Sequence, residues 1–155
     1  MPIDAALAKN AGLPRAPGAL GAAEACREVI TAYFHLSDAD ALDELGEIFA
    51  EDMDLGHGTS SVRGRSAAVE FLRSRRGAHP GRKTLHLLGS VQILALSEQR
   101  ASSVAAFSFH DSLKAGSEAG GLRLVGYYES HDSFVLEDGR WKLASHRAEA
   151  VASAP

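Results

Sequence analysis

Two kinds of periodicity divide this chain near its middle, and their order limits the folds it can adopt. Between residues 22 and 77, apolar side chains recur at spacings of three and four, which predicts amphipathic helices. From residue 84 onward, runs rich in Leu, Val, Ile and aromatic residues predict long strands. Helices first and long antiparallel strands afterwards indicate an α+β domain, with the helices packed on one face of a sheet.

Turn and capping residues place these elements more closely. A first helix starts at Ala22 and ends at the cluster Ser37–Asp40, whose residue types cap helices well. A third helix lies between Gly64 and Gly77, and Asp138-Gly139 predicts a hairpin turn. The second helix is expected around 42–49, short strands within 53–62, and long strands at 84–96, 102–113, 122–136 and 141–147.

The length of 155 residues suits one domain, because a core of this size needs no disulfide or metal to be stable. That domain is expected to span residues 22–150. Residues 1–21 carry three of the five prolines and predict a flexible arm, with packing on the domain or on a partner subunit as the alternative. Residues 151–155 are expected to form a C-terminal tail. The N-terminus lacks the basic start and apolar run of a secretory signal, which favours a cytoplasmic protein.

Charge and composition exclude several classes of function. Sixteen Lys and Arg residues stand against 20 Asp and Glu, and this net charge of −4 argues against a general nucleic-acid binder. No apolar run approaches the roughly 18 residues of a membrane span. Cys26 is the only cysteine, so an intramolecular disulfide framework is excluded. The seven histidines show none of the short spacings of zinc sites, and we expect no metal and no cofactor.

Glycines within the predicted strands point to a bent sheet. Gly89 and Gly126 lie inside long apolar runs, where glycine favours bulges and bends. A bent sheet closed by helices leaves a cavity, which is where small-molecule chemistry is expected.

Four segments resemble a known family. They are the stretch from Tyr33 to Asp52, Val62-Arg63-Gly64-Arg65, Lys83-Thr84-Leu85-His86, and Asp138-Gly139-Arg140-Trp141-Lys142-Leu143. In this order they resemble the SnoaL-like members of the nuclear transport factor 2 (NTF2) superfamily over roughly residues 22 to 150. The resemblance implies a cystatin-like fold, a cone-shaped α+β barrel with N-terminal helices packed on a strongly curved, mainly antiparallel sheet. The superfamily includes scytalone dehydratase, ketosteroid isomerase and the β-subunits of ring-hydroxylating dioxygenases.

Asp38 and His86 match the aspartate–histidine dyad of the dehydratase and dehydrochlorinase relatives. The resemblance implies that His86 is the general base and that Asp38 orients it. Histidine suits this role because its pKa lies near neutral pH and a carboxylate stabilises the imidazolium that forms. Without the resemblance, Asp38 is a helix cap and His86 an ordinary strand histidine.

Other side chains are candidates for polarising or binding the substrate. Tyr33 is similar to a carbonyl-polarising tyrosine of the dehydratase, but it also fits the apolar stripe of the first helix. His57 and His110 lie on predicted strands, and Arg147 matches an arginine near the pocket mouth of relatives, with an ordinary salt bridge as its alternative. Alternation from His86 places Ser90 on the same face. The remaining expected lining residues are Phe34, Leu55, Phe71, Leu88, Phe107, Tyr128 and Trp141.

The sequence therefore leads to two hypotheses. The first is a cofactor-independent lyase or isomerase, dehydratase-like, acting on a small apolar or cyclic organic substrate. The second is a non-catalytic ligand-binding or assembly module, such as a partner resembling a dioxygenase β-subunit. The resemblance also implies a homodimer formed through the open face of the sheet.

Overall fold

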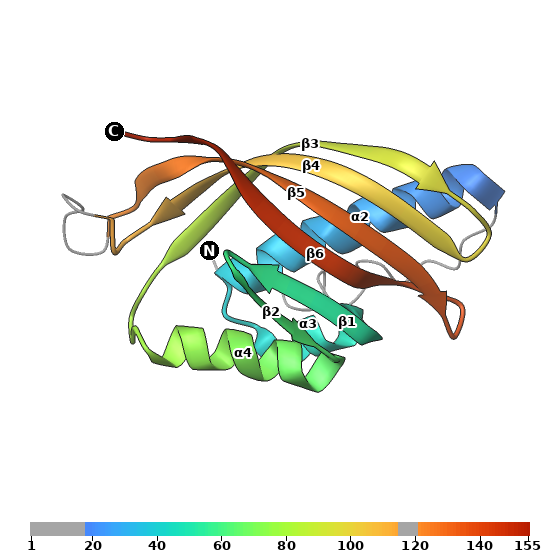
Figure 1. The fold of residues 1–155 in the computed structure, drawn as a ribbon, viewed down its shortest axis with the longest axis horizontal. Helices are drawn as coiled ribbons and strands as arrows, with labels where there is room; N and C mark the ends of the chain where they lie inside the picture. The colour runs from blue at the N-terminus through green and yellow to red at the C-terminus, as the bar shows by residue number, and fades with distance from the viewer. Residues whose placement is uncertain (1–17, 115–120) are drawn as a thin grey trace.

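A computed structural model describes residues 18–114 and 121–155 of the chain. Within this part, three helices precede and interrupt the strands of a single six-stranded sheet, whose order is β2-β1-β6-β5-β4-β3. Strands β1 and β6 pair in parallel and the other neighbours are antiparallel. The sheet curves over helix α2 (Figure 1), so the predicted α+β class and the curved, mainly antiparallel sheet are confirmed.

Helix α2 (Gly18–Asp38) forms because its apolar residues follow helical spacing. Ala25, Cys26, Val29 and Ile30 are fully buried between this helix and the sheet. The helix begins before the predicted boundary, since residues 18–21 of the expected arm belong to its first turn. The rest of that predicted arm lies outside the described residues.

Helix α3 (Leu42–Ile48) leads directly into strand β1 (Phe49–His57), which turns back through β2 (Ser60–Arg63). Helix α4 (Arg65–Gly77) then packs beside β1 and β2, along the lower side of the view in Figure 1. Gly64 precedes α4 with φ 99°, a conformation that glycine adopts without strain. This small layer holds β1 against the edge of the main sheet.

Four long strands make up the rest of the chain: β3 (Thr84–Leu96), β4 (Arg100–Asp111), β5 (Arg123–Glu137) and β6 (Arg140–Ser153). The predicted hairpin is present, with Gly139 at φ 73°. Strand β6 continues six residues beyond its predicted end at 147, because Ala150, Ala152 and Ser153 pair with the first part of β5. Small residues carry little strand signal of their own, so this extension depends on tertiary pairing.

The predicted bends are located at bulges. The register between β3 and β4 shifts between Leu88 and Ser90, on either side of Gly89. At Gly126, an added Cβ would lie 2.5 Å from the carbonyl oxygen of Ala152, so only glycine lets β5 and β6 approach this closely. Bulges increase local twist, and the twist closes the sheet around α2.

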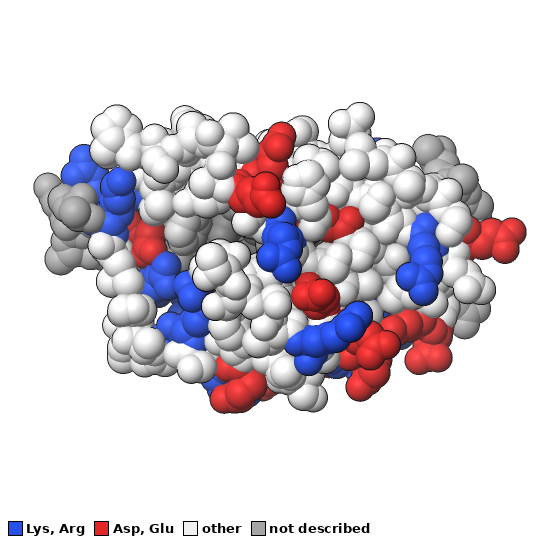
Figure 2. Space-filling model, viewed as in Figure 1, with Lys and Arg blue, Asp and Glu red and all other residues white. Residues whose placement is uncertain are grey.

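The surface carries charge of both signs. Figure 2 shows acidic and basic side chains interspersed over the face in view. Among the described helices, none has the length and hydropathy needed to cross a membrane.

Candidate active site

A cavity of about 340 Å³ lies between α2, the turn after β1 and the sheet face that α2 covers. Its walls are mainly aromatic, and its polar groups are few. Both the size and the lining suit a small organic molecule. The lining residues are Tyr33, Phe34, Gly56, His57, Gly58, His86, Phe107, Phe109, Tyr128, His146, Ala148 and Ala150.

Asp38 and His86, 48 positions apart in the chain, form a close pair at this cavity. The Nδ1–H of His86 donates to Asp38 Oδ1 over 2.7 Å, and the backbone N–H of His86 donates to Oδ2 over 2.7 Å. The hydroxyl of Thr84 donates to Oδ1 over 2.9 Å. Three hydrogen bonds from the start of β3 therefore fix the carboxylate at the end of α2.

The end of α2 explains why Asp38 reaches β3. Asp40 adopts a left-handed φ of 59°, and the N–H of Ala41 bonds to the carbonyl of Leu36, which turns the chain sharply. The N-cap of α3 is Ala41, with no side-chain hydrogen bond. Asp38 thus does not cap α3; its oxygens are used by Thr84 and His86.

The charge state of Asp38 follows from its partners. Burial pushes its pKa upward, but the hydrogen bonds and charge of His86, together with the bond from Thr84, outweigh burial and hold the pKa below its usual value. Asp38 is therefore ionised at neutral pH and binds the Nδ1–H side of His86. A fixed tautomer of this kind leaves the Nε2 lone pair available.

The ring of His86 is held between aromatic neighbours. Its centroid lies 5.1 Å from that of Phe34 and 4.8 Å from that of Phe109, with Phe109 nearly parallel. Nε2 forms no hydrogen bond within the described residues, and the ring lines the cavity. His86 thus presents its Nε2 to whatever occupies the cavity.

A second aspartate–histidine pair lies deeper in the same region. His146 on β6 and Asp132 on β5 face each other across the strands, with Nδ1 and Oδ1 2.6 Å apart. Asp132 is fully buried and also accepts from Ser130 over 2.9 Å and from Ser103 over 3.4 Å. The sequence interpretation did not include this pair, whose only signal is the cross-strand register of β5 and β6.

Two further polar groups border the cavity. Tyr33 is buried, which raises the pKa of its phenol, and the Asp132 carboxylate raises it further. Its ring centroid lies 4.3 Å from that of His146. Partial burial and the nearby charge of Arg75 lower the pKa of His57. At neutral pH the site therefore offers a neutral phenol and a neutral imidazole.

The structure brings many of the predicted site residues together. The cavity is lined by Tyr33, Phe34, His57, His86, Phe107 and Tyr128, with Asp38 directly behind His86. Phe109, which stacks on His86, was not predicted. It belongs to the same alternating face of β4 as Phe107, and this was the signal available for it.

Other predicted residues lie elsewhere. Leu55 and Trp141 are core residues, 2% and 1% exposed, and Leu88 packs against the same core. Phe71 projects from α4, with its ring 6.3 Å from that of His57, outside the cavity wall. None of these four side chains borders the cavity.

Three predicted polar residues point away from the cavity. Ser90 is exposed because the bulge at Gly89 breaks the alternation that starts at His86. His110 follows a register shift after Phe109 and does not line the cavity. Arg147 neighbours His146 and so faces outward, where its guanidinium lies over Gly56 of β1.

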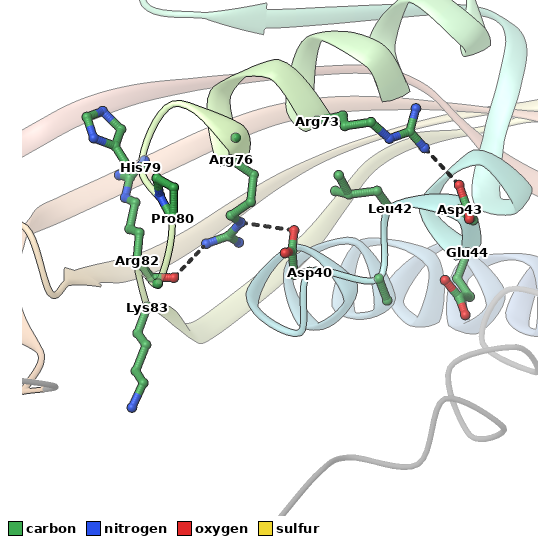
Figure 3. Close-up of a pocket in the computed structure, with 13 residues that line it drawn as sticks. Asp40, Leu42, Asp43, Glu44, Arg73, Arg76, His79, Pro80, Arg82 and Lys83 are labelled. Atoms are coloured by element: carbon green, nitrogen blue, oxygen red, sulfur yellow. Dashed lines mark hydrogen bonds and ion pairs between the residues drawn. The ribbon is translucent and has the colours of Figure 1, made fainter.

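A more open groove of about 740 Å³ lies between α3 and the segment after α4 (Figure 3). Its basic residues come from the C-terminal part of α4 and from the segment that follows it: Arg73, Arg76, His79, Arg82 and Lys83. Arg73 pairs with Asp43, Arg76 with Asp40, and Arg82 with Asp111. The protein's own carboxylates neutralise these three guanidinium groups, which leaves little free positive charge for an anionic ligand.

Metal ligands do not gather in the part of the chain that the structure describes. Across residues 18–114 and 121–155, no group of three or more His, Cys, Asp or Glu side chains is placed to hold a metal ion. Cys26 is buried in the core, which raises the pKa of its thiol to about 12.

Comparisons with known proteins agree with the fold of this chain. The family model of the SnoaL-like domain matches residues 19–147. A comparison with curated proteins finds no match. The fold is similar to that of the hexachlorocyclohexane dehydrochlorinase LinA-type3 from Novosphingobium barchaimii LL02, with 14% identity, a TM-score of 0.74, and 88% and 90% of the two chains covered. An NTF2-like protein with a cystatin-like fold from Novosphingobium aromaticivorans is 18% identical, with a TM-score of 0.65 and coverage of 81% and 79%.

Proposed function

The chain belongs to the SnoaL-like family, and from this premise and the geometry of its cavity we propose that it is a cofactor-independent lyase or isomerase. The proposed substrate is a small, largely apolar, cyclic organic molecule. The observation that carries the proposal is the hydrogen bond of 2.7 Å between Asp38 and His86, which leaves Nε2 of His86 open to an aromatic cavity.

The proposed reaction starts with proton removal. Nε2 of His86 takes a proton from a carbon atom of the substrate, and the imidazolium that forms is stabilised by the ionised Asp38. In an elimination, the electron pair of the broken C–H bond forms a double bond as a leaving group departs with its own electron pair. In an isomerisation, that electron pair passes to a neighbouring carbonyl as an enolate, and the imidazolium of His86 returns the proton at another carbon. The aromatic walls exclude water, which strengthens the interaction between Asp38 and the imidazolium.

Support for elimination chemistry also comes from the comparisons. The dehydrochlorinase that shares this fold is, by its name, an enzyme that removes hydrogen chloride from a cyclic substrate. At 14% identity the likeness concerns the fold, so the reaction proposed for this chain depends on the Asp38–His86 geometry.

The test is turnover of a panel of cyclic β-hydroxy ketones, β-chloro ketones and β,γ-unsaturated ketones, followed by proton NMR. We expect turnover by the wild type and a loss of about 10²–10⁴-fold in His86→Gln. His131→Gln is the matched control, since His131 is exposed on β5 and should keep full activity. Equal turnover by His86→Gln and the wild type would exclude His86 as the base. Binding of these molecules without turnover by the wild type would favour the ligand-binding module instead.

We also propose that the protein forms a homodimer through the outer face of the sheet. Large apolar side chains are exposed there, including Leu87 at 52%, Tyr127 at 54% and Val151 at 64%. Exposed apolar side chains gathered on one face are typical of an interface. Analytical ultracentrifugation should show a dimer that dissociates in Leu87→Glu, and a monomeric wild type would contradict this.

A further inference from the structure

The Asp132–His146 pair is not used in the proposed proton removal, yet it is the most buried carboxylate–histidine pair among the described residues. Asp132 has no exposed side-chain surface and His146 is 5% exposed. Burying a carboxylate is costly unless its oxygens are hydrogen-bonded. The three partners of Asp132 are His146, Ser130 and Ser103, and together they hold the carboxylate in a fixed position.

The histidine of this pair reaches the cavity. His146 is a lining residue, and its ring packs 4.3 Å from the ring of Tyr33 and 5.8 Å from that of Phe34. Nδ1 of His146 is hydrogen-bonded to Asp132, whereas its Nε2 has no hydrogen-bond partner in residues 18–114 and 121–155. The pair thus repeats the arrangement of Asp38 and His86, with a carboxylate behind and one ring nitrogen directed toward the cavity.

The two histidines approach the cavity from different strands. His86 is on β3 and His146 on β6, and β4 and β5 lie between them in the sheet. The ring centroid of Phe34 lies 5.1 Å from that of His86 and 5.8 Å from that of His146, so both imidazoles are close to the same aromatic side chain. Phe34 contacts both imidazole rings, so both border the same space.

We propose that Asp132–His146 is a second acid–base pair of this cavity, in which Nε2–H of His146 donates a proton to an oxygen atom of the substrate while His86 removes a proton from carbon. The proposal rests on the proposed function for the role of His86. His146 is then a catalytic residue, and Asp132 is a positioning residue that acts through it.

A dehydration breaks one C–H bond and one C–O bond of the substrate. The C–H bond breaks, its proton goes to Nε2 of His86, and its electron pair forms the C=C bond. The C–O bond breaks, and its electron pair takes the proton from Nε2 of His146, so that water leaves. His86 ends as an imidazolium and His146 as a neutral imidazole, and proton exchange with solvent restores both.

This arrangement predicts the substrate class. Hydroxide leaves poorly unless it is protonated, whereas chloride leaves without a proton. A group that donates a proton to oxygen has a use in removing water, or in polarising a carbonyl during isomerisation. The proposed substrate is therefore a cyclic alcohol or ketone whose oxygen lies against His146.

The test uses 4-nitrophenol, a ring of suitable size whose visible absorption distinguishes phenolate from phenol. The Nε2–H of His146 should donate a charge-assisted hydrogen bond to the phenolate oxygen. The decisive variant is His146→Asn, because the amide nitrogen of asparagine can replace Nδ1 toward Asp132 but has nothing in the place of Nε2. We expect affinity for the phenolate to fall at least about tenfold, corresponding to the loss of one charged hydrogen bond.

Matched variants separate this role from a structural one. His146→Gln keeps a donor near the position of Nε2 and should retain more affinity than His146→Asn, whereas His131→Asn should bind as the wild type does. Asp132→Asn provides a second route if His146→Asn does not fold, and it should weaken binding as well. Unchanged binding in the variants of the pair, or no binding to the wild type, would overturn the proposal.

Phenolate binding by the His86 variant separates failure of this proposal from failure of the proposed function. His86→Gln should still bind the phenolate, because the oxygen of the probe contacts His146. Phenolate binding that depends on His146, together with no turnover that depends on His86, would keep the oxygen site and reject the lyase.

Discussion

The two aspartate–histidine pairs are built from the same residue types and differ in how the fold holds them. Asp38 and His86 join the end of a helix to the start of a strand, with side chains 16% and 19% exposed. Asp132 and His146 are cross-strand neighbours, 0% and 5% exposed. The first carboxylate is held partly by a backbone N–H and the second only by side chains among the described contacts. The fold therefore holds the same two residue types in environments of different burial, and the following variants measure the consequences.

The largest expected difference between the two pairs is in the turnover of substrates with different leaving groups. On a cyclic β-hydroxy ketone, His146→Asn should lose about 10²–10⁴-fold in turnover, because the departing oxygen is no longer protonated. On the β-chloro ketone with the same carbon skeleton, it should keep most of its activity. His86→Gln should lose both reactions. Equal losses for the two leaving groups in His146→Asn would remove the distinction between the pairs.

Loss of the Asp132–His146 pair should destabilise the folded protein more than loss of the Asp38–His86 pair. Asp132→Ala leaves His146 without its buried partner and should lower the free energy of unfolding by about 3–5 kcal/mol. Asp38→Ala, at a partly exposed position, should cost about 1–3 kcal/mol. Urea denaturation followed by circular dichroism gives both values, and a larger cost for Asp38→Ala would contradict the burial argument.

The pH dependence of unfolding in acid should show how much Asp38 stabilises the folded protein. Its pKa is lower in the folded protein than in the unfolded chain, so its stabilisation is present above the unfolded value of roughly 4. That stabilisation is lost as the pH falls through the folded value. Between pH 5 and 3, the free energy of unfolding should therefore fall less for Asp38→Asn than for the wild type. The difference between the two falls measures the stabilisation by Asp38 that acid removes. Parallel pH profiles for the two proteins would show that Asp38 contributes nothing there.

The smallest effect is expected at Thr84. Thr84→Val removes one of the three hydrogen bonds to Asp38 and keeps the side-chain shape. It should cost about 0.5–1.5 kcal/mol in the free energy of unfolding and reduce turnover only several-fold. A loss as large as that of Asp38→Asn would mean that Thr84, and not the backbone of β3, positions the carboxylate.

The sequence predicts the fold well where periodicity is regular. The stripe of Cys26, Val29 and Ile30 predicts α2, and the turn Asp138-Gly139 predicts the last hairpin. The final part of β6 was not predicted, because alanines have little strand preference of their own. It is a strand because it pairs with the first part of β5. Local pattern therefore predicts which elements exist, and tertiary pairing sets how far they extend.

Within the site, predictability depends on how each residue is positioned. Asp38 and His86 could be identified because they lie in segments that resemble a family, although their spacing carries no information on contact. Asp132 and His146 meet through the register of β5 and β6, which no local pattern records. Ser90 was misplaced for a related reason: a single bulge at Gly89 reverses the face on which the following residues lie.

The parallel pairing of β1 with β6 has a consequence for how the protein folds. Strand β6 lies between β1 and β5, so the first strand of the chain has no place in the sheet until the last strand has formed. Contacts of such large sequence separation slow folding, since a long loop must close before they stabilise anything. The cavity wall contributed by Gly56 and His57 is therefore expected to assemble last. Trp141, the single tryptophan, lies buried on β6, and its fluorescence during refolding should report this late step.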